Sequence, residues 1–336
     1  MVENFLIRIA YFTEKGKEVY SKLEAGLQNA VFEVKSEEIA LKDFAKDSFE
    51  KHIPLVFVGA TGIAVRSIAP FIASKLSDIP VIVIDELGLN VIPILSGHYG
   101  MGNSLAKSLA KVLGATPIIT TATDIEKVYA IDSFAARNSF RILNKAMIKN
   151  VSMKLLSGDK VYYKNSIETL SFADNEPANI EEAKGKNWDI IFSEDESLKE
   201  NALIIAPKTL VVGMGCKRGK TFEALLEFLL EDYTLEELKN NLYAICSIDK
   251  KADELGLLRL AAYLHCKFIT FSAEELEAVS GDFSESEFVK EKVGVSNVSE
   301  RAAVCIGATL KTKKQAMDGM TKAYAIRDLR SIKWQE

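Results

Sequence analysis

The sequence predicts an α/β protein built from a parallel-sheet N-terminal domain, a small mixed middle domain and an α/β C-terminal domain. Two observations predict this organisation. The first and last thirds of the 336 residues alternate short apolar runs with runs of helical periodicity, a pattern typical of parallel strands connected by helices. The stretch between them instead has short strands separated by polar turns. These changes place the domains at 1–125, 126–206 and 207–336.

Strands of the N-terminal domain are predicted in FLIRIAYF, PLVFVGATG and IPVIVIDE, and a short one at the start of TPIITTATD. Residues 15–27 are predicted to form a helix. A second amphipathic helix is predicted in SLAKSLAKVLGA, where Leu105 and Leu109 share one face. Gly114 fits the C-terminal cap of that helix.

The middle domain is predicted to open with a helical run over residues 132–159 and to continue through strands in WDIIFSED and ALIIAP. The C-terminal domain begins at KTLVVGMGCKRG and repeats strand, loop and helix. Its final segment, KAYAIRDLR, is interpreted as a closing edge strand.

Composition excludes several classes of protein. The net charge of −5 disfavours a nucleic-acid partner, which would need a concentrated basic face. No uncharged apolar run of about 18 residues predicts a membrane span, and the first residues lack the apolar core of a signal peptide. The four cysteines form no CxxC pair, which argues against structural zinc and disulfides. We therefore expect a cytoplasmic protein.

A loop around His98 is the strongest candidate for a ligand site. Ligands of open α/β sheets bind beyond the carboxyl ends of the strands, where three loops are expected: 59–62, 85–88 and 95–103. In the third loop, Gly97 and Gly100 allow close approach of a ligand, and Asn103 or Ser104 could cap the following helix. Free N–H groups there would favour an anion, and His98 could act as acid or base. The alternative is that the glycines only make a tight turn.

Five further N-terminal residues are candidates, each with a structural alternative. Asp85 and Glu86 end a buried strand and could activate water, or could only cap it. Arg66 could hold a substrate carboxylate or form an ordinary salt bridge. The segment TTATD, which contains Thr121 and Asp124, could form a polar wall of the site or a helix cap.

The glycine-rich segment GMGCKRGKT fits neither nucleotide-binding motif. Gly219 comes one residue too late for the GxGxxG motif. A P-loop has four residues between its first glycine and Gly-Lys-Thr, but here three residues follow Gly215 and five follow Gly213 before that tripeptide. Lys217, Arg218 and Lys220 still form a candidate anion cradle, with Asp249 after the next strand as a further binding candidate. The alternative is that the lysines only keep the loop soluble. His52 and His265 are interpreted as structural.

Taken together, these segments resemble the cobalamin biosynthesis protein G (CbiG) family. The N-terminal resemblance lies in GIAVRSIAP, VIDELGLNVIPILSGHYGMGNSLA and LGATPIITTATD. The segment AARNSFRILNKAMIKNVSMKLLSGD is similar to the family's linking domain. VGMGCKRGKTFEAL, SIDKKADELGLLRLA, FSAEEL and VGVSNVSERAA are similar to its C-terminal domain. This sequence departs from the family at Met101, where a second glycine is usual, and in KTKKQAMDGMTKAYA.

The resemblance implies a hydrolase of anaerobic vitamin B12 synthesis. Such enzymes open the δ-lactone of cobalt-precorrin-5A, release acetaldehyde and yield cobalt-precorrin-5B. Cobalt arrives in the substrate, so no metal or other cofactor is expected on the protein. Neighbouring corrin-pathway enzymes and a second copy of the chain are candidate partners. The alternative function is a non-catalytic tetrapyrrole carrier of the same pathway.

The residues would fit that chemistry in stated roles. His98 could activate the water that opens the lactone, and the glycine-rich helix start could stabilise the oxyanion. Asp85, Glu86 or Asp124 could move protons during loss of acetaldehyde. We expect the carboxylate-ringed macrocycle to lie in a cleft between two α/β domains, with His98 facing that cleft and Arg and Lys side chains around it.

Overall fold

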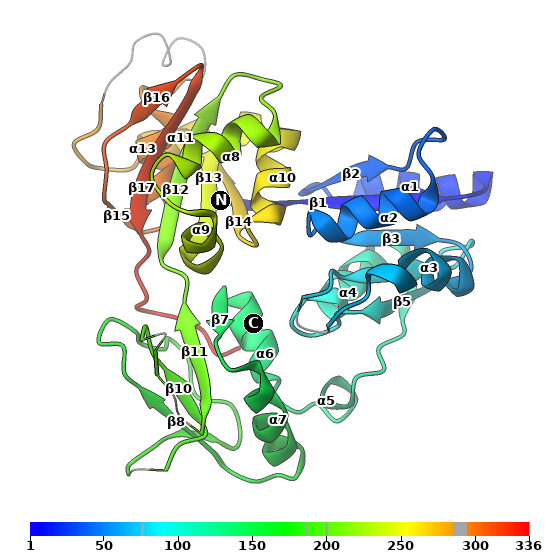
Figure 1. Ribbon diagram of the computed structural model, residues 1–336, viewed down its shortest axis with the longest axis horizontal. Helices are drawn as coiled ribbons and strands as arrows, with labels where there is room; N and C mark the ends of the chain where they lie inside the picture. The colour runs from blue at the N-terminus through cyan, green and yellow to red at the C-terminus, as the bar shows by residue number, and fades with distance from the viewer. Residues whose placement is uncertain (75–76, 186, 196, 199–200, 285–293, 336) are drawn as a thin grey trace.

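The computed structural model describes residues 1–74, 77–185, 187–195, 197–198, 201–284 and 294–335. Val293, the first residue of the VGVSNVSERAA segment, lies outside the described residues. Within them the chain forms a 12-stranded sheet, shared by the N- and C-terminal domains, and a separate 5-stranded sheet in the middle domain. Figure 1 shows the N-terminal domain in blue and cyan and the middle domain in green below the C-terminal domain. The predicted α/β class is confirmed.

The N-terminal part of the large sheet has helices on both faces. In spatial order its strands are β2 (Ala30–Val34), β1 (Val2–Tyr11), β3 (Leu55–Val58), β4 (Val81–Ile84), β5 (Asn90–Leu95) and β6 (Thr116–Pro117). One face packs against α1 (Glu14–Gly26) and α4 (Gly102–Leu113). The other face packs against α2 (Leu41–Glu50), α3 (Thr61–Ile68) and the short helix η1 (Ala69–Phe71). Apolar side chains on both sides of the strands explain why their sequences are continuously apolar.

One strand of this domain runs against its neighbours. β5 pairs antiparallel with β4, with Ile84 opposite Val91, because Asp85–Gly88 forms a hairpin turn in which Gly88 has a φ of +69°. The loop after β5 therefore lies at the sheet edge opposite the loops after β3 and β4. The prediction that the loops 59–62, 85–88 and 95–103 share one edge is wrong.

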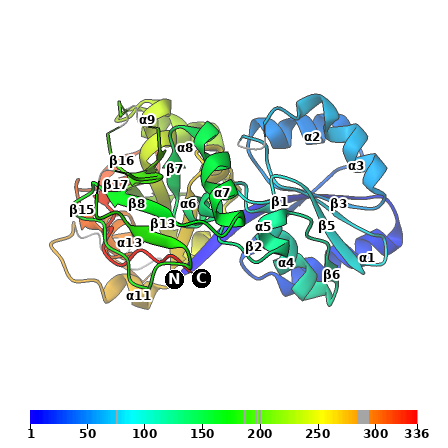
Figure 2. The same ribbon diagram turned by 90° about the horizontal axis from the view of Figure 1, so that it is seen from below.

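The C-terminal domain continues the same sheet. Its strands run in the order β15 (Thr309–Leu310), β17 (Met320–Ile326), β12 (Leu210–Cys216), β13 (Leu242–Ile248) and β14 (Lys267–Phe271), with β16 (Gln315–Met317) beside β17. β14 then pairs antiparallel with the first residues of β1, with Asn4 opposite Phe268. Figure 2 shows β1 reaching from the amino terminus beside this domain into the N-terminal sheet. The predicted closing strand, β17, is not at the edge, because β15 and β16 pair with its other side.

Helices also cover both faces of this part of the sheet. One core contains side chains of α8 (Phe222–Leu230), α9 (Leu235–Asn241) and α10 (Leu255–Tyr263). The opposite core contains α11 (Ala273–Glu277) and α13 (Val298–Val304). A short helix, η3 (Asp249–Lys251), follows β13. None of the helices in the described ranges combines the length and the apolar character that crossing a bilayer requires.

The middle domain has its own sheet, in the order β7 (Phe140–Ile142), β11 (Leu203–Pro207), β10 (Ile190–Phe192), β8 (Val161–Asn165) and β9 (Ile180–Glu182). Its helices are α6 (Ile131–Arg137), η2 (Lys145–Met147) and α7 (Ile148–Leu156). The continuous helix expected over 132–159 is therefore interrupted. Phe140 and Ile142 point into the core with strand periodicity and pair β7 with β11.

The carboxyl-terminal residues leave the C-terminal domain and enter the core of the middle domain. Trp334 is fully buried there, and its ring stacks on Phe172 and Phe134 with centroids 4.3 and 4.8 Å apart. Leu329 and Ile332 belong to the same core. The middle domain is thus built from two separate stretches of chain, whereas the sequence boundaries assign everything from residue 207 onward to the C-terminal domain.

Candidate functional site

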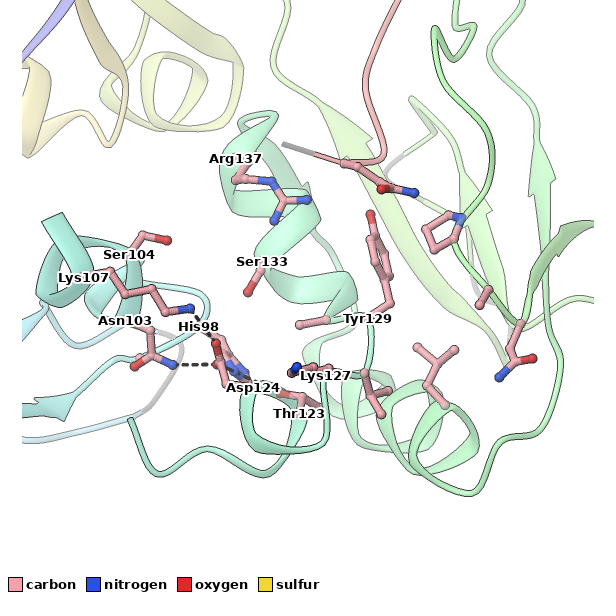
Figure 3. Close-up of a pocket in the computed structure, with 18 residues that line it drawn as sticks. His98, Asn103, Ser104, Lys107, Thr123, Asp124, Lys127, Tyr129, Ser133 and Arg137 are labelled. Carbon is pink, nitrogen blue, oxygen red and sulfur yellow. Dashed lines mark hydrogen bonds and ion pairs between the residues drawn. The ribbon is translucent and has the colours of Figure 1, made fainter. Parts of the chain in front are cut away.

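His98 lies in a pocket of about 490 Å³ between the N-terminal and middle domains. We call it the His98 pocket; it is lined mainly by Gly97, His98, Asn103, Ser104, Lys107, Thr123, Asp124, Lys127, Tyr129, Ser133 and Arg137. Figure 3 shows side chains from α4, from the α5 segment (Ala122–Ile125) and from α6 converging on it. His98 itself therefore faces a pocket between the N-terminal and middle domains, whereas the expected cleft was one between the two α/β domains.

The order of strands explains why distant segments meet in this pocket. β5, α4 and β6 form a strand–helix–strand unit, and β6 pairs parallel with β5. The carboxyl ends of both strands therefore lie at the same edge of the sheet. The loop 96–101 follows β5 and the segment TTATD follows β6, which places His98 beside Asp124.

The His98 loop is tight, and its small residues allow it to fold back on itself. A Cβ added to Gly100 would lie 2.6 Å from the Ser96 Cβ, and one added to Gly102 would lie 2.9 Å from the Ser96 carbonyl oxygen. Met101 has a φ of +62°, a conformation that costs a non-glycine residue roughly 1–2 kcal/mol. Met101 therefore introduces local strain but keeps the loop closed.

The start of α4 differs from the expected anion site. The Gly102 N–H donates to the Ser96 carbonyl at 3.0 Å, and the Asn103 N–H donates to the Gly97 carbonyl at 2.9 Å. These first two donors are therefore occupied by the loop and are not free for a ligand. The expected side-chain cap is also wrong, since the cap residue is Met101 and no side chain caps this helix. The Asn103 side chain instead points into the pocket.

Asp124 is the centre of a hydrogen-bonded cluster. Its Oδ2 accepts from His98 Nε2 at 2.9 Å, from Asn103 Nδ2 at 2.9 Å and from Thr121 Oγ1 at 2.7 Å, while its Oδ1 accepts from Lys107 Nζ at 3.0 Å. Burial opposes ionisation of this carboxyl, but the donors outweigh burial and hold its pKa well below the usual range. Asp124 is therefore a carboxylate at neutral pH. Figure 3 shows its bonds to Asn103 and Lys107.

The imidazole of His98 lies between two carboxylates. Its Nε2 contacts Asp124 and also Thr123 Oγ1, at 3.0 Å, and its Nδ1 lies 3.7 Å from the Asp132 carboxylate. Asp132 comes from the first turn of α6 in the middle domain. Tyr99 packs against the middle-domain core beside it. Contact with the middle domain thus orients the loop and brings the second carboxylate to His98.

Sequence reasoning missed Lys107, Asp132 and Arg137, and it named Thr123 only as part of the segment TTATD. Lys107 lies one helical turn after Asn103, so helical spacing could have found it. Asp132 and Arg137 come from another domain, and no local pattern links them to His98. The C-terminal tail positions part of this wall, because the Trp334 carbonyl accepts hydrogen bonds from Arg137 at 2.9 Å and from the Tyr129 hydroxyl at 2.8 Å.

Asp85, Glu86 and Arg66 lie away from the His98 pocket. The Asp85 carboxylate accepts the N–H groups of Leu87, Leu89 and Asn90. Although burial opposes it, these bonds lower the pKa of Asp85. Asp85 thus stabilises the β4–β5 turn. Glu86 is exposed in that turn, and Arg66 is exposed on α3. The four residues of β4 separate this edge from the His98 loop, by roughly 13 Å at about 3.3 Å per residue.

The basic loop after β12 is engaged with acidic partners. Arg218 pairs with Asp253 and Lys220 with Asp318, both at 2.6 Å. The aliphatic chain of Lys217 packs on Gly319. Asp249 starts η3 at the same edge of the sheet and is exposed. As far as the described residues show, neither these three basic residues nor Asp249 lines the His98 pocket.

Among the described residues, no group of three or more His, Cys, Asp or Glu side chains is arranged to hold a metal ion. All four cysteines carry free thiols.

Comparison with known proteins identifies the family. The model of the cobalamin synthesis G N-terminal domain matches residues 43–124, and that of the cobalamin synthesis G C-terminus matches residues 210–325. The chain is 36% identical to a cobalt-precorrin-5A hydrolase of Salmonella typhimurium, over 77% of each chain. It is 32% identical to one of Priestia megaterium, over 83% of this chain and 79% of the relative. A probable cobalt-precorrin-5A hydrolase of Methanocaldococcus jannaschii is 26% identical over 96% of this chain and 100% of its own length. The chain therefore belongs to the cobalt-precorrin-5A hydrolase family.

Proposed function

We propose that this protein hydrolyses the δ-lactone of cobalt-precorrin-5A and releases acetaldehyde, giving cobalt-precorrin-5B. The observation that carries the proposal is the His98–Asp124 pair in a pocket at the carboxyl ends of β5 and β6. Both residues lie within the matched N-terminal family region. A histidine bonded to a carboxylate is the arrangement that activates water for attack on an acyl group.

We infer a role for each nitrogen of His98 from its hydrogen bonds. Asp124 stays ionised, so it accepts the proton of Nε2 and fixes the neutral imidazole in one tautomer. Nδ1 is then the basic nitrogen. Asp132, 3.7 Å from it, stabilises the imidazolium that forms when Nδ1 takes a proton from water. Asp124 and Asp132 are thus positioning residues, and His98 is the catalytic base.

The two bond cleavages then follow in order. Water adds to the lactone carbonyl as His98 takes its proton, and the acyl C–O bond breaks to leave a carboxylate and a secondary alcohol. The imidazolium gives this first proton to solvent, and the regenerated neutral His98 takes the alcohol proton as the adjacent C–C bond breaks and acetaldehyde leaves. The electron pair of that bond stays on the macrocycle carbon, which takes a proton from the imidazolium.

Positively charged side chains, and not the start of α4 as expected, would stabilise the oxyanion. The Gly102 and Asn103 N–H groups are already bonded, whereas Lys107 and Arg137 line the pocket with positive charge. Both are suited to a carboxylate arm of the substrate or to the charge that develops on the lactone oxygen.

We further propose that the protein binds no cofactor of its own, since cobalt is part of the substrate, and that it acts in the cytoplasm, where its free thiols would stay reduced. Other corrin-pathway enzymes would supply the substrate and accept the product.

The test is release of acetaldehyde by the purified protein from authentic cobalt-precorrin-5A. One acetaldehyde per substrate is expected without NAD, ATP or added metal, and EDTA should not change the rate. A protein that binds the macrocycle but releases no acetaldehyde would be a carrier, and the proposal would be wrong.

A further inference from the structure

A second cavity lies on the other side of the His98 loop. Its volume is about 680 Å³. It is formed where all three domains meet, by the amino-terminal ends of several strands and by Tyr99, Gly100 and Met101 of the loop itself. We call it the central cleft and define it by Asn4, Pro54, Tyr99, Arg141, Lys208 and His265. Arg137 lines both the central cleft and the His98 pocket.

The central cleft contains a buried lysine. Lys208 is only 6% exposed, and its Nζ donates to the His265 carbonyl at 2.9 Å. In the part of the chain that the structure describes, no carboxylate forms an ion pair with Lys208. Burial, with a small contribution from the positive charge of Arg141, lowers the pKa of Lys208 to about 8.

Two other buried or half-buried lysines of this protein are paired with carboxylates. Lys322, which is 1% exposed, pairs with Glu231 and Asp232. Lys251 pairs with Glu254 at 2.9 Å. A buried ammonium without a carboxylate is costly unless something else compensates its charge. A bound ligand with a negative charge would therefore supply the partner that Lys208 lacks.

The histidines of the cleft add no positive charge. The rings of His52 and His265 lie 3.9 Å apart between their centroids. Burial and neighbouring positive charges lower the pKa of His265 to about 3, and burial also lowers that of His52. Both rings are neutral at physiological pH. The ligand charge is thus met by Lys208 and Arg141, beside uncharged imidazoles.

We propose that the central cleft binds a carboxylate arm of the tetrapyrrole through Lys208 and Arg141, while the lactone ring lies against His98 in the adjoining pocket. This inference rests on the proposed function for the identity of the ligand. Arg137, at the junction of the two cavities, would contact the part of the macrocycle between them. The basic loop 217–220 would then make no contact with the substrate.

The experiment is substitution of Lys208 with methionine, with Lys220→Met as the matched control. Lys220 is a partly buried, ion-paired lysine outside both cavities. Binding of cobalt-precorrin-5A is followed by its absorbance, together with KM, kcat and the melting temperature. Loss of a hydrogen bond to a charged group should raise Kd and KM by about 10- to 100-fold. In Lys208→Met, kcat should stay within about threefold and the melting temperature should not fall.

Three outcomes decide the inference. An unchanged Kd in Lys208→Met, or an equal rise in Kd in Lys220→Met, would overturn it. A lower melting temperature with normal Kd would also overturn it, because Lys208 would then be structural. If Lys208→Met does not fold, Lys208→Gln, which keeps an uncharged N–H donor, gives the same test. Kd is measured in the His98→Ala background, where turnover is slow, so failure of the wild-type protein to release acetaldehyde would refute the proposed function and leave the binding test decisive.

Discussion

Replacing Asp124 with asparagine should separate the orientation of His98 from the rest of the site. The substitution keeps the size of the side chain but removes the charge and turns one acceptor into an N–H donor. That donor would face His98 Nε2, Asn103 Nδ2 or Thr121 Oγ1, all of which lie within 3.0 Å of Oδ2 in the wild-type protein. The imidazole would then favour the other tautomer, with its proton on Nδ1 and no base for water.

The size of the effect follows from this change of tautomer. In a serine protease, the equivalent aspartate-to-asparagine change lowers kcat by about 10⁴. The Asp124 carboxylate is 22% exposed, so water can partly replace its bonds. We therefore expect kcat to fall by about 10²- to 10⁴-fold, with KM changed by less than about threefold because positioning, and not binding, is lost.

Stability gives an independent check on the same residue. The pKa of Asp124 is lowered in the folded protein, so its contribution to stability is present above the unfolded pKa of about 3.9 and is lost as the pH falls below it. Asp124→Asn should lower the free energy of unfolding by about 1–3 kcal/mol at pH 7. The difference from wild type should shrink as the pH falls below about 4.

The assay is acetaldehyde release in single turnover, with urea unfolding at several pH values. Asp85→Asn is the matched control, because Asp85 is also a carboxylate with a lowered pKa but lies at the opposite sheet edge. Its substitution should destabilise the β4–β5 turn and leave kcat unchanged. If Asp124→Asn keeps wild-type kcat, or if both variants lose activity equally, the reasoning is refuted.

Three further predictions concern the frame around the site. Met101→Gly should relieve the left-handed strain and stabilise the protein by up to about 1 kcal/mol, after the entropy of the unfolded glycine is subtracted; a lower urea midpoint would contradict this. Trp334→Ala should lower the free energy of unfolding by about 3–5 kcal/mol, since it leaves a cavity in the aromatic core. Trp334→Phe should recover part of that stability. If Trp334→Ala is as stable as wild type, the tail does not stabilise the middle domain. Asp132→Asn should lower kcat by roughly 10-fold and keep the melting temperature; unchanged kcat would remove Asp132 from the account.

Much of the fold can be predicted from the sequence, because buried parallel strands are continuously apolar and helices show their own period. The antiparallel direction of β5 could also have been predicted from the sequence. Asp85–Gly88 separates two apolar runs with a short turn that contains glycine, which is a hairpin signal. The predicted strands did not include NVIPIL, which forms β5, so the loops were wrongly placed at one edge.

The site was predictable only in part, for a physical reason. His98, Asn103, Thr121 and Asp124 belong to one strand–helix–strand unit, so local reasoning could bring them together. Asp132, Arg137 and Lys208 reach the two cavities through the packing of other domains, and the carboxyl-terminal Trp334 acts through a core far away in sequence. Contacts of this kind depend on domain arrangement, which no local pattern encodes.

The measurement that tests the central claim most directly is acetaldehyde release by His98→Ala and His98→Asn, compared with wild type under single turnover. Both variants should fold, bind cobalt-precorrin-5A nearly as well as wild type, and turn over about 10²- to 10⁴-fold more slowly. Asparagine can form hydrogen bonds but cannot take up the proton, so it should not restore the rate. A folded His98→Ala protein that releases acetaldehyde at the wild-type rate would contradict the assignment of His98 as the base. If His98→Asn restores the rate, His98 only positions the substrate.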